Sequence, residues 1–226
     1  MIRNGRLVLP LITEENRKKI FWPAAFYLYF SYTLTGSYAF FAPWHPPHTA
    51  IDAAVPFLPG TIWIYLSHIA LLFTAWWWMI RGEACTRAFW AMVMCAVLST
   101  VYFFFFPTEL PRRALADIDA GPVTQAAWAF LQQADHPTNS FPSMHVAEAV
   151  IGMVALVRSH PHWGWLAPVW AGAIAISTLT TEQHVLVDVL GGLALATFCL
   201  LVSERYTDVV SGPAATPPAG EPATDR

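Results

Sequence analysis

Six long runs of apolar residues, separated by polar or proline-rich connections, dominate the hydrophobic pattern of this chain. Their bounds are 21–41, 61–80, 88–106, 141–157, 163–179 and 185–202. A helix of about 20 apolar residues is about 30 Å long, which matches the hydrocarbon core of a bilayer. The pattern predicts an all-α membrane protein with a six-transmembrane-helix bundle at 21–203. Residues 1–20 are then a cytoplasmic N-terminal segment, and 204–226 a disordered cytoplasmic tail.

The longest connection, residues 107–140, contains a second periodic pattern. Val123, Ala127, Phe130 and Leu131 recur at helical spacing. We expect a short amphipathic helix here, lying on the membrane interface.

Composition supports a membrane protein and excludes several other classes. Hydrophobic residues make up 56% of the chain and charged residues only 12%, about half the usual share of charge. A net charge of −3 gives no reason to expect a nucleic-acid partner. The three cysteines predict no disulfide framework, and neither they nor the scattered histidines have metal-ligand spacing. We therefore expect no metal and no cofactor.

The distribution of cations predicts the orientation in the membrane. Six spans place both termini on one side, together with most of the cations: Arg3, Arg6, Arg17, Lys18, Lys19, Arg81, Arg87, Arg158, Arg205 and Arg226. Only Arg112 and Arg113 lie on the other side. The positive-inside rule then puts the termini in the cytoplasm of a plasma membrane, such as a bacterial inner membrane.

Polar residues at the ends of four runs fall on the predicted outer face. His184 and Asp188 lie four residues apart at the start of the sixth run, so both project from one face of a helix. A carboxylate bound to one imidazole nitrogen would leave the other free to attack an electrophile. His145 opens the fourth run, Ser177 lies near the end of the fifth, and Arg112 follows the third.

These residues are candidates for a phosphate site, although each has a structural alternative. His184 could only cap a helix at the interface, and the two arginines could only anchor the chain there. A carboxylate one turn inside an apolar run is costly, however, and usually functional. Glu148 could orient His145 or only balance local charge. Two helix N-termini on the same face would also favour an anion.

Two segments resemble signature motifs of the type 2 phosphatidic acid phosphatase superfamily. They are Phe141-Pro142-Ser143-Met144-His145, and Ser177-Thr178 followed after five residues by His184 and then Asp188. The Ser-Met-His form and the run Val-Asp-Val-Leu-Gly-Gly are similar to its inositol phosphorylceramide synthase-like branch.

The resemblance implies a six-helix enzyme in which His184 is the nucleophile, Asp188 orients it and His145 protonates the leaving oxygen. Ser143 and Ser177 would contact phosphate oxygens. Apart from the resemblance, Arg112 and Arg113 are candidates for phosphate binding because they are the only cations on the predicted outer side. The chain departs from the family pattern at two cations: Phe105 stands where a lysine is usual, and Thr178 where an arginine is usual.

Two functions follow as hypotheses. The first is a metal-independent lipid phosphatase or phosphotransferase acting on a lipid phosphate substrate through a phosphohistidine. The second is a non-catalytic transporter that uses His184 and Asp188 as a proton relay. The runs at 21–41, 61–80 and 88–106 carry no charge, which disfavours the relay. The head group, the acceptor and the oligomeric state stay open.

Overall fold

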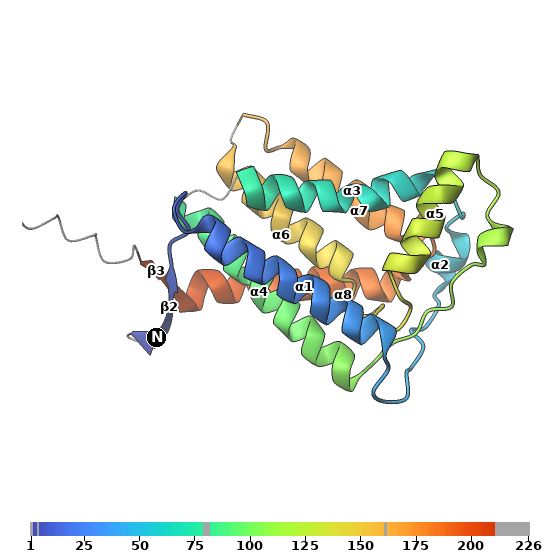
Figure 1. The fold of residues 1–226 in the computed structure, drawn as a ribbon, viewed down its shortest axis with the longest axis horizontal. Helices are drawn as coiled ribbons and strands as arrows, with labels where there is room; N and C mark the ends of the chain where they lie inside the picture. Colours follow the sequence, from blue (N-terminus) through green and yellow to red (C-terminus); the bar gives the residue numbers. More distant parts are fainter. Residues whose placement is uncertain (1, 4, 79–81, 161, 211–226) are drawn as a thin grey trace, which may run out of the picture.

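The computed structural model describes residues 2–3, 5–78, 82–160 and 162–210. Long helices run along a common direction in this part of the chain, as Figure 1 shows. The α-helices are α1 (Arg17–Ser37), α2 (Ala50–Ala54), α3 (Ile62–Phe73), α4 (Gly82–Phe105), α5 (Pro122–Ala134), α6 (Met144–Ser159), α7 (Leu166–Thr180) and α8 (Leu186–Tyr206). Short helical turns are η1 (Pro59–Thr61), the π-helical η2 (Thr74–Trp78) and η3 (Leu115–Asp117).

Five of the six apolar runs form most of one α-helix each, and the described part of the run 61–80 forms α3 followed by η2. Among the described residues, α4 and α8 are long and apolar enough to cross a membrane, with 24 and 21 residues. These lengths correspond to about 36 and 32 Å, which exceed a bilayer core of about 30 Å. Helix α7 is apolar but shorter. The prediction of a predominantly helical protein is therefore confirmed, whereas the number of spans stays a prediction.

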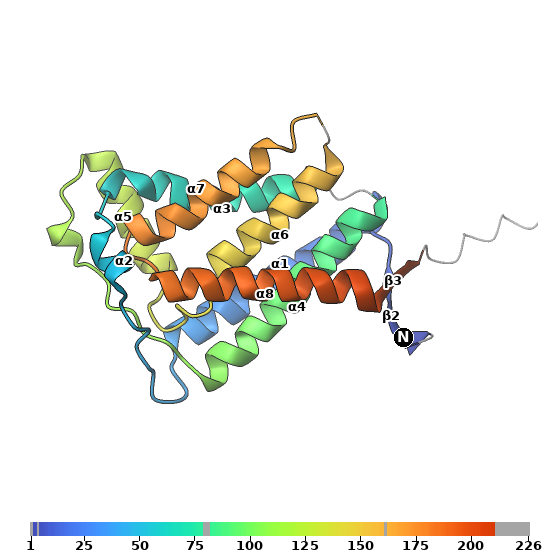
Figure 2. The ribbon, with the colours of Figure 1, turned by 180° about the vertical axis from the view of Figure 1, so that it is seen from behind.

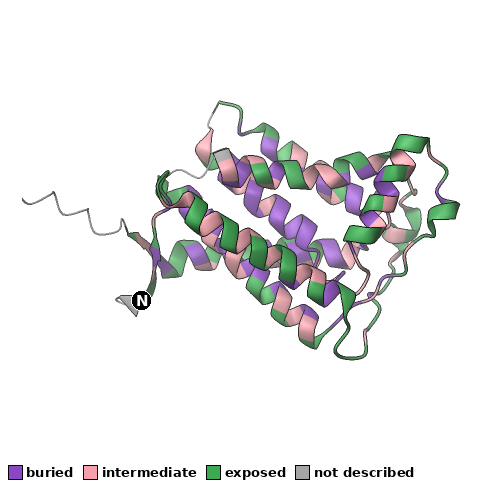
Figure 3. Cartoon of the chain, in the orientation of Figure 1, coloured by how far each residue is buried: buried purple, intermediate pink, exposed green. Residues whose placement is uncertain are grey.

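Helix α6 is the centre of the bundle and packs against α3, α4, α7 and α8. Its buried residues join one core cluster with α4, α7 and α8, and Figure 3 shows the concentration of buried positions along it. Gly152 lies where α6 approaches α3, and a Cβ there would lie 2.5 Å from a methyl group of Leu71, which would have to move.

Close contact between α8 and the start of α6 depends on paired glycines. A Cβ on Gly191 would lie 2.6 Å from the ring of Phe141, and one on Gly192 would collide with the backbone carbonyl of Ser143. Small residues of this kind let helix backbones approach. The two glycines thus bring the two histidine motifs together.

The amphipathic helix expected in the long connection is present as α5, but it buries a different face. Ala127 and Leu131 are buried as predicted, whereas Val123 and Phe130 are exposed. Trp128 replaces them in the core, where its indole N–H donates to the carbonyl of Pro59 at 3.1 Å. A large aromatic side chain with a hydrogen-bond partner gains more from burial than valine does.

A small sheet joins the two ends of the chain, which the apolar pattern did not predict. Strand β2 (Arg6–Pro10) pairs antiparallel with β1 (Ile2–Arg3) and parallel with β3 (Thr207–Val210). Residues 204–210, expected to begin a disordered tail, thus complete α8 and form β3. Residues 211–226 of that predicted tail lie outside the described residues.

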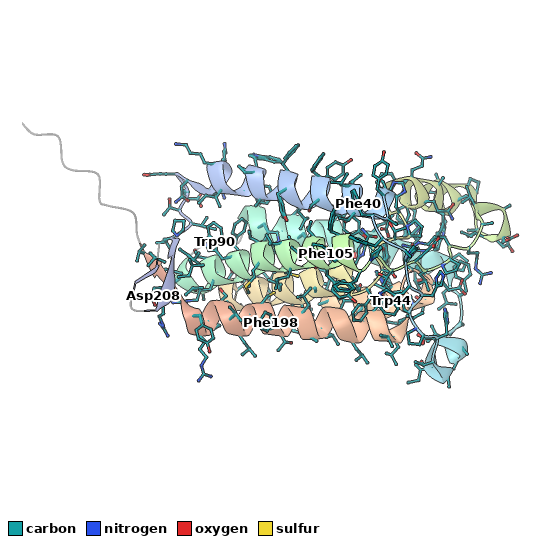
Figure 4. The ribbon with its side chains drawn as sticks, turned by 90° about the horizontal axis from the view of Figure 1, so that it is seen from below. Phe40, Trp44, Trp90, Phe105, Phe198 and Asp208 are labelled. Carbon is teal, nitrogen blue, oxygen red and sulfur yellow. The ribbon has the colours of Figure 1, made fainter. Side chains whose placement is uncertain are left out.

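The two ends of the bundle differ in character. The strands and the described chain ends lie at one end, whereas α2 and α5 cover the other, as both views of the ribbon show (Figures 1 and 2). Figure 4 places Asp208 at the strand end and Trp44 near the opposite end. Both histidine motifs lie at the end covered by α2 and α5, because α6 and α8 both begin there.

Candidate active site

His184 lies in the tight connection between α7 and α8. The backbone N–H groups of Gln183 and His184 both donate to the carbonyl of Thr178, at 3.0 and 3.1 Å. Glu182 makes this turn possible by adopting a left-handed backbone, with φ of 54°. These backbone hydrogen bonds fix the position of His184 independently of its side-chain contacts. The residue is only 4% exposed.

Asp188 binds His184 as the four-residue spacing predicts. The Oδ2 atom lies 3.3 Å from His184 Nδ1 and accepts the backbone N–H of Val185 at 3.1 Å. With Nδ1–H directed to the carboxylate, Nε2 carries the lone pair. That atom is buried and has no hydrogen-bond partner among the described residues, and the same is true of Asp188 Oδ1. A buried nitrogen without a partner is costly, which marks a place for a ligand.

His145 lies beside His184, although 39 positions separate them in the sequence. The ring centroids are 5.7 Å apart. Ser143 links the two motifs: its backbone N–H donates to the carbonyl of Asp188 at 3.0 Å, and its hydroxyl accepts the N–H of Val146 at 3.4 Å as the cap of α6. The first turn of α6 thereby fixes where the His145 imidazole points.

His145 has partners that the sequence did not suggest. The Tyr65 hydroxyl lies 2.9 Å from Nε2 and 3.2 Å from Nδ1 of His145. The same hydroxyl donates to Asp135 Oδ2 at 2.9 Å, and the Tyr32 hydroxyl donates to Asp135 Oδ1 at 2.6 Å. His145 is therefore connected to a carboxylate through a tyrosine. No pattern marked Tyr65, because tyrosine is common in apolar membrane segments.

The two neighbouring arginines have different surroundings. Arg112 enters the site, where it donates to the carbonyl of Gln183 at 2.9 Å and lies 3.5 Å from Asp135 Oδ2. Its Nε is buried and has no partner among the described residues. Arg113 stays at the surface in a two-point ion pair with Glu182, at 2.7 and 3.0 Å, and covers the ring of Phe57. Only Arg112 has a donor left for an anion inside the site.

The charge of Arg112 also explains the state of Asp135, which follows α5. Burial alone would raise the pKa of this carboxyl. The nearby guanidinium, the two histidines and the Tyr32 hydroxyl together outweigh that effect and lower the pKa to about 2. Asp135 is therefore ionised at every ordinary pH. Its charge stabilises the fold above the unfolded value near 3.8, and this contribution is lost as the pH falls through about 2.

The remaining predicted residues have partners within their own helices or at their ends. Ser177 is buried and donates its hydroxyl to the carbonyl of Ile174 at 2.7 Å, so only its oxygen lone pairs stay available. The Ser143 hydroxyl accepts a hydrogen bond as a cap and keeps its own proton to donate. Ser143 is thus the better donor to a phosphate oxygen.

The N-terminus of α8 is less available to an anion than the sequence suggested. Asp52, which forms a capping box with Thr49 on α2, also accepts the backbone N–H of Leu186 at 2.6 Å. A carboxylate of this protein thus already lies at that positive helix end. The N-terminus of α6 is therefore a better candidate for binding phosphate than the N-terminus of α8.

A cavity of about 440 Å³ begins at His145 and Asp135 and continues between α1, α3, α4 and α6. Its lining is mainly carbon, from side chains such as Leu28, Leu72 and Met92. It reaches Phe21 and Trp76, and along α1 the distance from Tyr32 to Phe21 is about 16 Å. Within the described part of the chain, no group of three or more histidine, cysteine or carboxylate side chains could hold a metal ion.

A family model described as the PAP2 superfamily matches residues 40–202. This match includes both histidine motifs and most of the bundle, and the chain belongs to the PAP2 superfamily. The chain is also similar to a PA-phosphatase related-family protein of Dictyostelium discoideum, with 26% identity over 167 residues. That alignment covers 65% of this chain but only 30% of the relative. Membership supports a phosphatase-type enzyme acting on phosphate esters, consistent with a membrane protein.

Proposed function

We propose that this chain transfers the phosphoryl group of a lipid phosphate ester through a phosphohistidine on His184. With water as the acceptor it is a lipid phosphatase, and with an alcohol it is a phosphotransferase. The observation that carries the proposal is the Nε2 of His184, which has no partner among the described residues and lies beside a second histidine in a buried site. Superfamily membership agrees with this reaction class.

In the first step the lone pair of His184 Nε2 attacks phosphorus. The N–P bond forms as the ester P–O bond breaks, and the leaving oxygen takes a proton from His145. Asp188 holds the Nδ1 proton, so that Nε2 is the attacking atom. Arg112 and the N-terminus of α6 stabilise the charge on the other phosphate oxygens.

In the second step His145, now neutral, removes a proton from water or an alcohol. The oxygen of that acceptor forms a new P–O bond as the N–P bond breaks, which restores His184. Dividing the reaction in this way replaces one difficult displacement with two easier ones. Tyr65 accepts a hydrogen bond from His145 and directs its own proton to Asp135, which favours protonated His145 in the first step.

A lipid substrate is favoured by the surroundings of the site. The cavity beside His145 is lined by hydrocarbon. Large apolar side chains also cover the outside of the long helices, among them Phe26, Val169 and Phe198, which are more than half exposed. Figure 4 shows Phe198 at the outer edge of α8. Such a surface suits the hydrocarbon of a bilayer better than water.

The cation distribution supports an outward-facing site, with six membrane crossings and both termini in the cytoplasm. The strand end, with Arg6, Arg87 and Arg205, is then the cytoplasmic end. Among the lysines and arginines that the structure describes, only Arg112 and Arg113 lie at the site end.

One experiment tests the chemistry and the sidedness together. Sealed right-side-out membrane vesicles receive phosphatidic acid with ³²P in its phosphate, delivered to the outer leaflet. We expect an acid-labile, base-stable label on the wild-type chain and none on His184→Ala. His160→Ala, a histidine at the strand end that stacks on Trp163, is the matched control and should label normally. Equal labelling of His184→Ala would disprove the nucleophile, and labelling only in inverted vesicles would disprove the sidedness.

A further inference from the structure

Glu148 is a buried carboxyl that the proposed chemistry does not use. It follows His145 by three residues on α6, so it lies on the same helix face and about 4.5 Å deeper along the axis. The residue is only 5% exposed and lines the apolar cavity. No residue that the structure describes forms a hydrogen bond or ion pair with its carboxyl. Carboxyls in apolar segments are costly, and they mark function by default.

The site has two regions around His145, one that suits an anion and one that suits a neutral polar group. On one side lie His184 and Arg112, each with a nitrogen that has no partner in the described part of the chain and suits an anion. On the other side lies the cavity, where the carboxyls of Asp135 and Glu148 face a lining of hydrocarbon. A phosphate group would be repelled by the ionised Asp135, whereas a neutral hydroxyl or amide would hydrogen-bond to the Glu148 carboxyl. The cavity therefore suits the uncharged part of a substrate.

We infer that this cavity binds the alcohol half of the substrate and that Glu148 recognises a second hydrogen-bonding group on it. The inference rests on the proposed function, because it takes His145 to contact the reacting oxygen. The hydrocarbon chain lies between α1, α3 and α4, and the reacting oxygen lies at His145. A second hydroxyl or amide group, close to that oxygen on the same molecule, reaches the Glu148 carboxyl one helical turn deeper. The ligand class is thus a long-chain alcohol with a neighbouring hydrogen-bonding group, as leaving group or as acceptor.

His68 strengthens the distinction between the two regions. Its ring lies 4.5 Å from that of His145 and also lines the cavity. Its Nδ1 faces the carbonyl of Tyr65 at 3.2 Å, which favours a proton on that nitrogen and a lone pair on Nε2. The polar groups at the cavity mouth thus include acceptors that match the donors of a diol or an amino alcohol.

The test compares two photoreactive probes that differ by one hydroxyl: a long-chain 1-alkanol and the 1,2-alkanediol of the same length, each with a diazirine near the chain end. Half-maximal labelling of the purified protein gives the apparent affinity. We expect the wild-type chain to bind the diol roughly tenfold more tightly, the effect of one additional buried hydrogen bond. Crosslinks should map to cavity residues of α1, α3 or α4.

Variants assign that preference to one side chain. Glu148→Leu should bind both probes equally, whereas Glu148→Gln should keep most of the preference because its amide still forms hydrogen bonds. Thr197→Leu is the matched control, because Thr197 is an exposed polar residue on α8 away from the cavity. It should behave like the wild type. A preference that survives in Glu148→Leu, a wild type without preference, or crosslinks outside the cavity would each overturn the inference.

The binding measurement is independent of catalysis. His184→Ala should show the same tenfold preference as the wild type, since no phosphoryl group is transferred. If the wild type fails to form a phosphohistidine but still prefers the diol in a Glu148-dependent way, the proposed reaction is wrong and the alcohol site stands.

Discussion

The two histidines of the site are supported in different ways. His184 contacts its carboxylate directly, and both residues belong to one short segment between α7 and α8. His145 reaches Asp135 only through the hydroxyl of Tyr65, and these three residues come from α6, the end of α5 and α3. The His184–Asp188 pair is a local contact that fixes the tautomer of His184. The contacts of His145 form a network between helices, which exists only when the bundle is assembled.

This difference has a chemical consequence. A nucleophile needs a lone pair of defined direction, which one adjacent carboxylate can provide. A group that first donates and then accepts a proton needs surroundings that tolerate both states. The tyrosine supplies them, because its hydroxyl can accept from protonated His145 while donating to Asp135. We therefore expect the two halves to respond differently to substitution.

Among the substitutions around His145, we expect His145→Ala to lower the reaction rate most. Loss of a general acid typically lowers the rate by about 10²- to 10⁴-fold. The sharpest measurement uses two esters, one with an alkyl and one with a nitrophenyl leaving group, because only the alkyl leaving oxygen needs a proton. We expect a much smaller loss on the nitrophenyl ester. Equal losses on both esters would show that His145 does not protonate the leaving oxygen.

The adjacent arginines allow a matched comparison, in which only the substitution of Arg112 should lower activity, by an intermediate amount. Arg112→Gln should lower kcat/KM by about 10²-fold, since the removal of one preorganised donor to a developing oxyanion costs about that much. Arg113→Gln breaks a surface ion pair, which is worth little, and a contact with the ring of Phe57, and it should change kcat/KM less than about twofold. Steady-state kinetics on one lipid phosphate compare them. Similar losses in both variants would contradict the separate surroundings of the two side chains.

The smallest of the three effects is expected from Tyr65→Phe. It removes the hydrogen bond to His145 without removing the ring, and a hydrogen bond to a charged group is worth about 1.5–3 kcal/mol, or roughly 10- to 100-fold in rate. Because protonated His145 loses an acceptor, its apparent pKa in the kcat/KM profile should fall and the acidic form should be lost at lower pH. The pH–rate profile is the readout. An unchanged profile would mean that Tyr65 only fills space.

The sequence was informative wherever a feature depends on neighbouring residues. The His184–Asp188 pair involves two residues about one helical turn apart, so their spacing predicted the geometry. The apolar runs also predicted the helices, because the length of a run and its composition set the length of a helix. These features determined the helical class and one half of the candidate site.

Only the tertiary structure decided which distant residues complete the site. Tyr65 and His145 are 80 positions apart, and Tyr32 and Asp135 are 103 apart, so their hydrogen bonds depend on how α1, α3, α5 and α6 pack. The same holds for Asp52, whose carboxylate occupies the start of α8 across 134 positions. It also holds for the choice of Arg112 over Arg113, since adjacent residues look alike in a pattern, whereas in the fold Arg112 reaches Asp135 and Arg113 stays at the surface. Local spacing fixes a side chain relative to its own helix, and only the packing of helices fixes what that side chain meets.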